Sequence, residues 1–189
     1  MSPAAMQDLA RYLLTHRRHY PGMWTVQGFG FMRLRISERL RLHVWDSRLR
    51  KPGVSDVHDH AQWSFRSDVV SGQIVNQRYA IGPIGLRFKC ANIRCGIGGG
   101  MSREPTTEVT LAPQRPESYI EAQHYEQEPD EIHRTFALDG TVTLLQQWRR
   151  DTDTARVFWQ AGDWVDAEPR QATEEEIDMI GETALAVMQ

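Results

Sequence analysis

The sequence predicts a mainly β protein of the sandwich, jelly-roll or barrel type, with a helix near each end of the chain. Short runs of alternating polar and apolar residues fill the middle of the 189-residue chain, and turn residues separate these runs. Apolar residues at helical spacing occur near both termini. Many short strands at regular spacing are typical of such β folds. The length suits one large domain or two very small ones, and we expect a single domain over residues 1–189.

The two helices are predicted at about residues 3–19 and 173–188. The first ends at Tyr20-Pro21-Gly22, and the second begins at Thr173, which has a glutamate three residues later, the spacing of a capping box. Both helices are expected to pack on the outside of the domain. Their apolar residues are Met6, Leu9, Leu13 and Leu14 in the first helix and Ile177, Ile180, Ala184, Leu185 and Met188 in the second.

Between the helices, a β-barrel is predicted over about residues 25–165, with breaks between strands at turn residues such as Gly82-Pro83. The glycine-rich segment 95–100 fits a flexible hairpin or lid better than a phosphate loop, and a long loop is expected within 101–116. The candidate strands are Phe31–Ile36, Arg39–Trp45, Val57–Trp63, Phe65–Val70, Gln73–Tyr79, Leu86–Cys95, Glu108–Ala112, Ser118–Tyr125, Glu131–Ala137, Thr141–Trp148 and Ala155–Trp159.

Composition excludes several classes of protein. The 22 Lys and Arg residues against 25 Asp and Glu give a net charge of −3, which argues against nucleic-acid binding and against a polybasic membrane patch. No apolar run approaches the ~20 residues of a membrane span. Asp8 and Arg11 interrupt any secretory signal. Cys90 and Cys95 would face opposite sides of a strand, so we expect no disulfide between them and a cytoplasmic location.

Three histidines are the candidate chemical site. On a strand, His58 and His60 project from the same face while Asp59 points the other way, so the two imidazoles can converge on one metal ion. His133 lies in a second strand-like segment and would complete a three-nitrogen face if that segment pairs with the His58 strand. Such a face leaves coordination positions open for substrate, water or dioxygen. Surface histidines are the alternative for the His58 pair, and His124 is the alternative third ligand.

The histidine pattern resembles the cupin superfamily, whose double-stranded β-helix places His-x-His on one strand and a last histidine in a second motif. Gly53 and Gly72 fit the glycines that flank the first motif. Many cupins have a glutamate ligand where this chain has Phe65. The resemblance covers about residues 30–150 and implies a jelly-roll barrel, with a homodimer considered on cupin analogy alone.

Within the cupins, the Val-His58-Asp-His60 opening and the His133-Arg134-Thr135 context are similar to those of thiol dioxygenases of the cysteine dioxygenase type. This resemblance implies an iron(II) centre held by three neutral imidazoles, with dioxygen and a small thiol-bearing acid as the reactants. It also implies an arginine on an early strand that binds the substrate carboxylate. Arg33 is the candidate for this role, and Arg35 and Arg41 are its competitors.

Two further residues are weighed for this site. Tyr125 could supply a proton or position dioxygen, with core packing as the alternative, and His43 is expected on an outward face. The cysteine that cross-links to tyrosine in some thiol dioxygenases corresponds to Phe65, and no Ser-x-His-x-Tyr sequence follows His133. The alternatives are therefore an oxygenase with another substrate, a zinc, nickel or manganese cupin with isomerase or lyase activity, and a ligand-binding cupin without catalysis.

Overall fold

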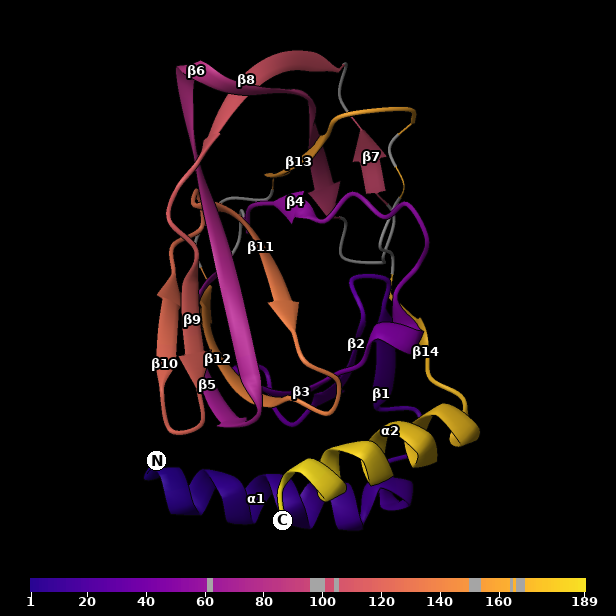
Figure 1. Ribbon diagram of the computed structural model, residues 1–189. Coiled ribbons are helices and arrows are strands. Elements are labelled where there is room, and N and C mark those ends of the chain that lie inside the picture. Colours follow the sequence, from indigo (N-terminus) through magenta and orange to yellow (C-terminus); the bar gives the residue numbers. More distant parts are fainter. Residues whose placement is uncertain (61–62, 96–100, 104–105, 150–153, 164, 166–168) are drawn as a thin grey trace.

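The computed structural model describes residues 1–189 except 61–62, 96–100, 104–105, 150–153, 164 and 166–168 (Figure 1). The described chain is mainly β, with two antiparallel sheets and a helix near each terminus. The first sheet has the order β10-β5-β12-β3-β2-β1-β14. The second has the order β11-β4-β13-β6-β7, and β8 and β9 also pair with β6. The mainly β prediction with terminal helices is confirmed.

The first sheet lies between the helices and the interior of the molecule. Its strands are β1 (Trp24–Gln27), β2 (Phe31–Arg35), β3 (Leu40–Trp45), β5 (Trp63–Ser71), β10 (His124–Gln127), β12 (Val142–Arg149) and β14 (Arg170–Gln171). The strands of the second sheet are β4 (Val57–His58), β6 (Gln73–Cys95), β7 (Met101–Arg103), β8 (Thr107–Pro113), β9 (Glu117–Ile120), β11 (Ile132–Ala137) and β13 (Thr154–Trp159).

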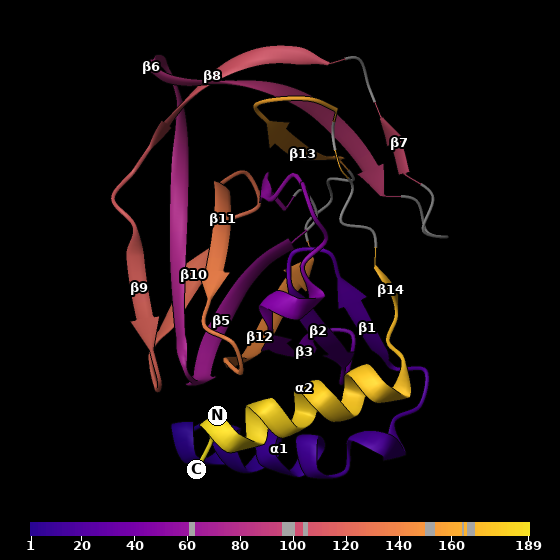
Figure 2. The ribbon, with the colours of Figure 1, turned by 45° about the vertical axis from the view of Figure 1, so that its right-hand side comes forward.

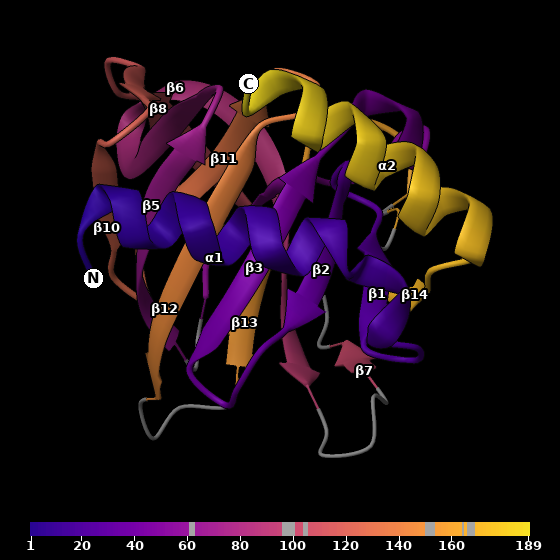
Figure 3. The same cartoon turned by 90° about the horizontal axis from the view of Figure 1, so that it is seen from below.

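Both helices, α1 (Pro3–Thr15) and α2 (Glu174–Val187), run side by side across the outer face of the first sheet (Figure 3). The predicted capping box is present at the start of α2, where Thr173 and Glu176 each bond the other's backbone N–H. The first helix is shorter than expected, because a 3-10 turn over Arg17–His19 replaces its last residues. Alternate residues of β2 and β3 pack against the helices in one apolar core, among them Met32, Leu34, Leu42 and Val44.

Strand β6 differs most from the sequence prediction. Two strands were expected with a break at Gly82-Pro83, but a single strand spans Gln73–Cys95 and bends over the top of the molecule beside β8 (Figure 2). The predicted break survives as a register irregularity between Ile81 and Leu86, because β8 pairs with β6 on both sides of it. A Cβ at Gly85 would lie 2.3 Å from the Leu111 carbonyl oxygen, so glycine permits this close approach.

Two other segments also depart from expectation. The long loop expected within 101–116 holds β7 and β8, of which β8 matches the candidate strand Glu108–Ala112. Within the candidate strand Val57–Trp63, β4 covers only Val57–His58, residues 59–60 lie outside any strand, residues 61–62 lie outside the described residues, and β5 begins at Trp63. Most of the glycine-rich segment lies outside the described residues. No helix among the described residues is both long enough and apolar enough to cross a membrane.

The turn between β5 and β6 gives a stability prediction. Gly72 has φ +81°, and a Cβ there would lie 2.4 Å from Oγ1 and 2.9 Å from Cα of Thr141. Gly22 has a similar φ of +75° with no atom within 4 Å of the added Cβ. We expect Gly72→Ala to lower the free energy of unfolding by at least about 2 kcal/mol and Gly22→Ala by only about 1 kcal/mol. Urea unfolding measures the free energy of unfolding of both variants. Equal losses of stability would show that Thr141 can move away from the added Cβ at little cost.

Candidate metal centre

Three histidine side chains meet at one point between the two sheets. His58 lies on β4, His60 follows two residues later, and His133 lies on β11. One ring nitrogen from each lies within 4.8 Å of the other two. In the antiparallel ladder His133 is directly opposite His58, the pairing that would bring the second segment to the first. The exposed His124 lies on β10 and is not part of this group.

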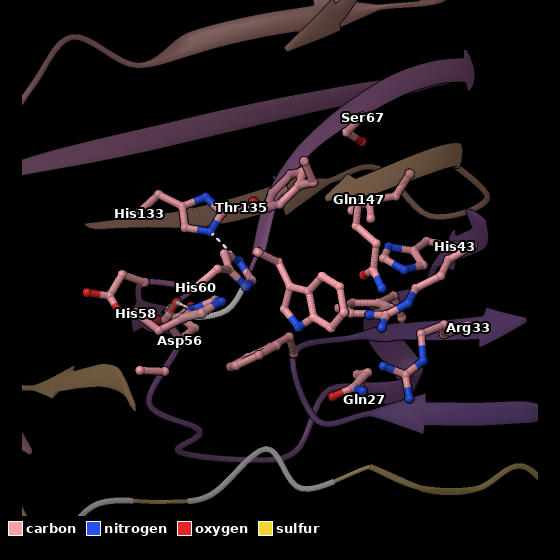
Figure 4. Close-up of a pocket in the computed structure, with 18 of the residues that line it drawn as sticks. Gln27, Arg33, His43, Asp56, His58, His60, Ser67, His133, Thr135 and Gln147 are labelled. Carbon is pink, nitrogen blue, oxygen red and sulfur yellow. Dashed lines mark hydrogen bonds between the residues drawn. The ribbon is translucent and has the colours of Figure 1, made fainter. Parts of the chain in front are cut away.

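Hydrogen bonds on the far side of two rings determine which nitrogens face the cluster. His58 Nδ1 is 2.9 Å from the Asp56 carbonyl oxygen, and His133 Nδ1 is 2.8 Å from Asn76 Oδ1. Both oxygens can only accept, so Nδ1 carries the proton in each ring and Nε2 has a free lone pair. His60 Nε2 lies 3.0 Å from His133 Nε2, so these two ring nitrogens face each other (Figure 4). This orientation of ring nitrogens is typical of metal ligands.

The segments that carry the histidines are held by Asp59 and Arg156. The Asp59 carboxylate, which is buried, accepts from the Arg156 backbone N–H at 2.6 Å and from Nε at 2.5 Å. Nη2 of the same guanidinium donates to the Asp130 carbonyl at 3.2 Å, three residues before His133. Burial raises the pKa of Asp59, although the bonds from Arg156 oppose this. Asp59 therefore supports the backbone of this region and stays out of the histidine cluster.

Burial also fixes the charge of the imidazoles. It lowers the pKa of His58, and it lowers the pKa of His60 and His133 well below 6.5. At His60 and His133, the positive charges of the neighbouring histidine and arginine side chains add to the effect of burial. The Asp56 carbonyl partly offsets this effect at His58. The rings are therefore neutral at neutral pH, which is the form that binds a divalent metal ion.

The cluster forms one end of a cavity of about 310 Å³ between the sheets (Figure 4). Phe65 lies edge-on to His60, with ring centroids 5.0 Å apart, at the side of the cluster. Other aromatic side chains form much of the wall between the histidines and the opposite end. The lining residues used below are Phe31, Arg33, Arg41, His43, Trp45, Trp63, Ser67, Tyr125, Thr135 and Gln147.

The opposite end of the cavity is cationic. Arg33 and Arg41 line it, whereas the competitor Arg35 is exposed and does not. Arg33 Nε donates to Thr25 Oγ1 at 3.2 Å, while Arg41 Nε is buried with no hydrogen-bond partner among the described residues. Burial lowers the pKa of Arg41 to about 10, and the charges of Arg33 and Arg35 add to this effect. An anionic group from a ligand would relieve this repulsion.

His43 is buried at this cationic end, so its expected outward orientation is wrong. It shares strand parity with Arg41 and Trp45, as the sequence indicated, but that face of β3 is the inner one because the helices cover the other face. Its ring stacks on Phe31 at 4.6 Å, and its buried Nε2 has no hydrogen-bond partner in the described part of the chain. Burial and the neighbouring arginines hold the pKa of His43 well below 6.5.

Tyr125 both packs in the core and lines the cavity. It lies on β10 opposite Ser67, and its ring contacts Phe65 with centroids 6.0 Å apart. Burial raises the pKa of Tyr125, partly opposed by hydrogen bonds to Ser67 and Thr135. Tyr125 was expected here from the sequence, whereas its hydroxyl partners Ser67 and Thr135, and the residues Asn76 and Gln127 behind His133, were not. The available signal was an asparagine two residues after the apolar Ile74, and therefore on the same face of the strand.

No protein-family model matches this sequence, and no curated protein matches it. The assignment of the site therefore depends on its geometry and on the histidine pattern.

The lowered histidine pKa values predict a pH dependence of stability. Above about pH 6.5 the buried histidines are neutral in both the folded and the unfolded state. Below this pH the histidines of the unfolded chain bind protons, whereas those of the folded protein stay neutral. The free energy of unfolding should fall as pH drops from 7.5 to 5.5, by up to about 1.4 kcal/mol per pH unit for each such ring. His43→Leu should reduce this slope in urea titrations without added metal. An unchanged slope would mean that His43 is protonated in the folded state.

Proposed function

We propose that this chain is a cupin-type non-haem iron(II) dioxygenase whose substrate is a small thiol-bearing acid. The observation that carries this proposal is the convergence of three neutral imidazoles, two of them with fixed Nε2 lone pairs, at one end of a cavity whose other end is cationic. Two sheets that enclose the cluster are compatible with the jelly-roll barrel that the resemblance to cupins implies.

The donor set fits a first-row divalent metal ion. Imidazole nitrogen suits iron, zinc, copper and nickel, and the mutual distances of up to 4.8 Å allow all three rings to reach one ion. The nearby carboxylates are engaged elsewhere, since Asp56 pairs with Arg50 and Asp59 with Arg156. A bound iron(II) ion would supply a centre of double positive charge with open positions for a thiolate and for dioxygen.

The chain's own residues would bind and orient the substrate. Arg33 and Arg41 present guanidinium groups that suit a carboxylate, and the aromatic walls exclude water around the reacting sulfur. Tyr125 keeps its proton at neutral pH, so it can donate a hydrogen bond to an oxygen atom of the reacting group. For a thiol, the balanced overall reaction adds both atoms of dioxygen to sulfur and yields a sulfinic acid.

A second candidate is a zinc, nickel or manganese cupin with isomerase or lyase activity. The three-imidazole set, which lacks a carboxylate, favours this alternative as much as it favours iron. Phe65, in place of the cysteine of some thiol dioxygenases, also leaves the substrate open. Metal content without oxygen uptake would support this candidate.

The proposal is tested by oxygen uptake. Protein loaded anaerobically with iron(II) should consume dioxygen when given short thiol-bearing acids, with formation of the sulfinic acid followed by mass spectrometry. His133→Ala should lose more than about 100-fold in iron affinity, since removing a ligand costs more than the 10–100-fold typical of its supporting residues.

His124→Ala is the matched control, because this histidine is exposed on β10, a strand of the other sheet. It should retain both iron and oxygen uptake. If His133→Ala retained iron and His124→Ala lost it, His124 and not His133 would be the third ligand. If the protein bound iron but consumed no dioxygen with any of the thiols, the proposed dioxygenase activity would be refuted.

The cationic end gives a separate prediction about substrate affinity. Arg41→Met and Arg33→Met should each weaken the binding of a thiol-bearing acid by roughly 10–100-fold, the loss of one or two charge-assisted hydrogen bonds. Iron content should be unchanged, and a thiol without a carboxylate should bind the variants and the parent equally well. Arg35→Met, at an exposed site on the same strand as Arg33, is the control. Equal affinities in anaerobic titrations would remove both arginines from the site.

A further inference from the structure

Behind His133 lies a short chain of buried amide groups that the proposed reaction does not use. Asn76 on β6 is completely buried, and Gln127, the last residue of β10, is 1% exposed. Burial of two carboxamides in the core is unfavourable unless their donors and acceptors are paired. Here they are paired with each other, with the His133 ring and with the backbone of Glu131.

The hydrogen bonds of this amide chain have a fixed direction. The Glu131 carbonyl can only accept, and Gln127 Nε2 donates to it at 3.0 Å. Gln127 Oε1 therefore faces Asn76 and accepts from Nδ2 at 3.1 Å. This leaves Asn76 Oδ1 directed at His133 Nδ1, at 2.8 Å. The backbone carbonyl of Glu131 thus determines, through the Gln127 and Asn76 side chains, which nitrogen of the His133 ring carries the proton.

We propose that Asn76 and Gln127 are positioning residues that hold His133 in the tautomer with its proton on Nδ1, so that the Nε2 lone pair faces His58 and His60. If both amides were reversed, Asn76 would present its N–H₂ group to Nδ1. The proton would then move to Nε2, where it blocks metal binding. The link to metal rests on the proposed function, whereas the choice of tautomer does not.

A comparison with His58 shows why the His133 ring needs a side-chain acceptor. The ring of His58 is oriented directly by a backbone carbonyl, that of Asp56 two residues away. His133 is the second residue of β11, which pairs with both β4 and β6, and this pairing engages the neighbouring backbone carbonyls. A side-chain acceptor is therefore required. Asn76 is in a suitable place on β6, opposite Thr135 and two ladder positions from His133.

The test combines tautomer and affinity measurements. In metal-free protein labelled with ¹⁵N-histidine, the His133 ring should show a protonated Nδ1 and an unprotonated Nε2. Asn76→Leu should populate the other tautomer and weaken Zn²⁺ binding, measured against a chromophoric chelator, by about 10–100-fold. Gln127→Leu should do the same to a smaller extent, because Asn76 can then reverse its amide.

Conservative variants separate positioning from packing. Asn76→Asp keeps an oxygen acceptor facing His133 Nδ1, and Gln127→Glu keeps an oxygen acceptor facing Asn76 Nδ2. Both variants should therefore retain the parent tautomer of His133 and bind Zn²⁺ with an affinity within a few-fold of the parent. Gln77→Leu is the matched control, since this amide is on the next residue of β6 and bonds to backbone carbonyls. It should change neither measurement.

Two outcomes would overturn the proposal: a parent tautomer and parent Zn²⁺ affinity in Asn76→Leu, or an Asn76→Asp variant that is folded and as impaired as Asn76→Leu. If Asn76→Leu does not fold, the comparison of Gln127→Leu with Gln127→Glu tests the proposal by the same two measurements, the His133 tautomer and the Zn²⁺ affinity. If the parent protein binds no Zn²⁺, the proposed function fails while the tautomer measurement still tests the positioning role.

Discussion

The pairing of β11 with β4 is the constraint on which the candidate site depends. The two strands place His133 opposite His58, and the period of two in a strand then directs both side chains to the same side of the second sheet. A shift of one residue in this register would turn His133 away from the cavity. The pairing of β11 with β6 over six residues opposes such a shift, since it buries Ile132 on the other face.

The first sheet is divided between two functions by the same alternation. Its outer face is apolar and stabilises the fold by packing on α1 and α2, while its inner face presents arginine, histidine and aromatic side chains to the cavity. Charged groups that are partly buried without acidic partners lower the stability of a protein. The retention of Arg41, whose buried Nε has no hydrogen-bond partner among the described residues, is understandable if a ligand supplies a negative charge.

Local sequence signals predicted the elements whose causes are local. The capping box at Thr173 and the apolar spacing predicted α2 almost to the residue. The histidine cluster joins distant segments, and it was predicted from a recognisable motif rather than from a local signal. The inner face of β3 could not be assigned, because it depends on where the helices pack, so His43 was placed wrongly. Asn76 and Gln127 were missed for a similar reason: their partners are far away in sequence.

The guanidinium of Arg156 joins the two stretches of chain that carry the histidines, through the Asp59 carboxylate on one side and the Asp130 carbonyl on the other. The cluster is thus assembled from separate segments, and this guanidinium adds a side-chain link to the pairing of β11 with β4. Thermal opening of β13 would release both segments from Arg156 in the same event. The centre should accordingly behave as one cooperative unit, with partly assembled states short-lived and scarcely populated.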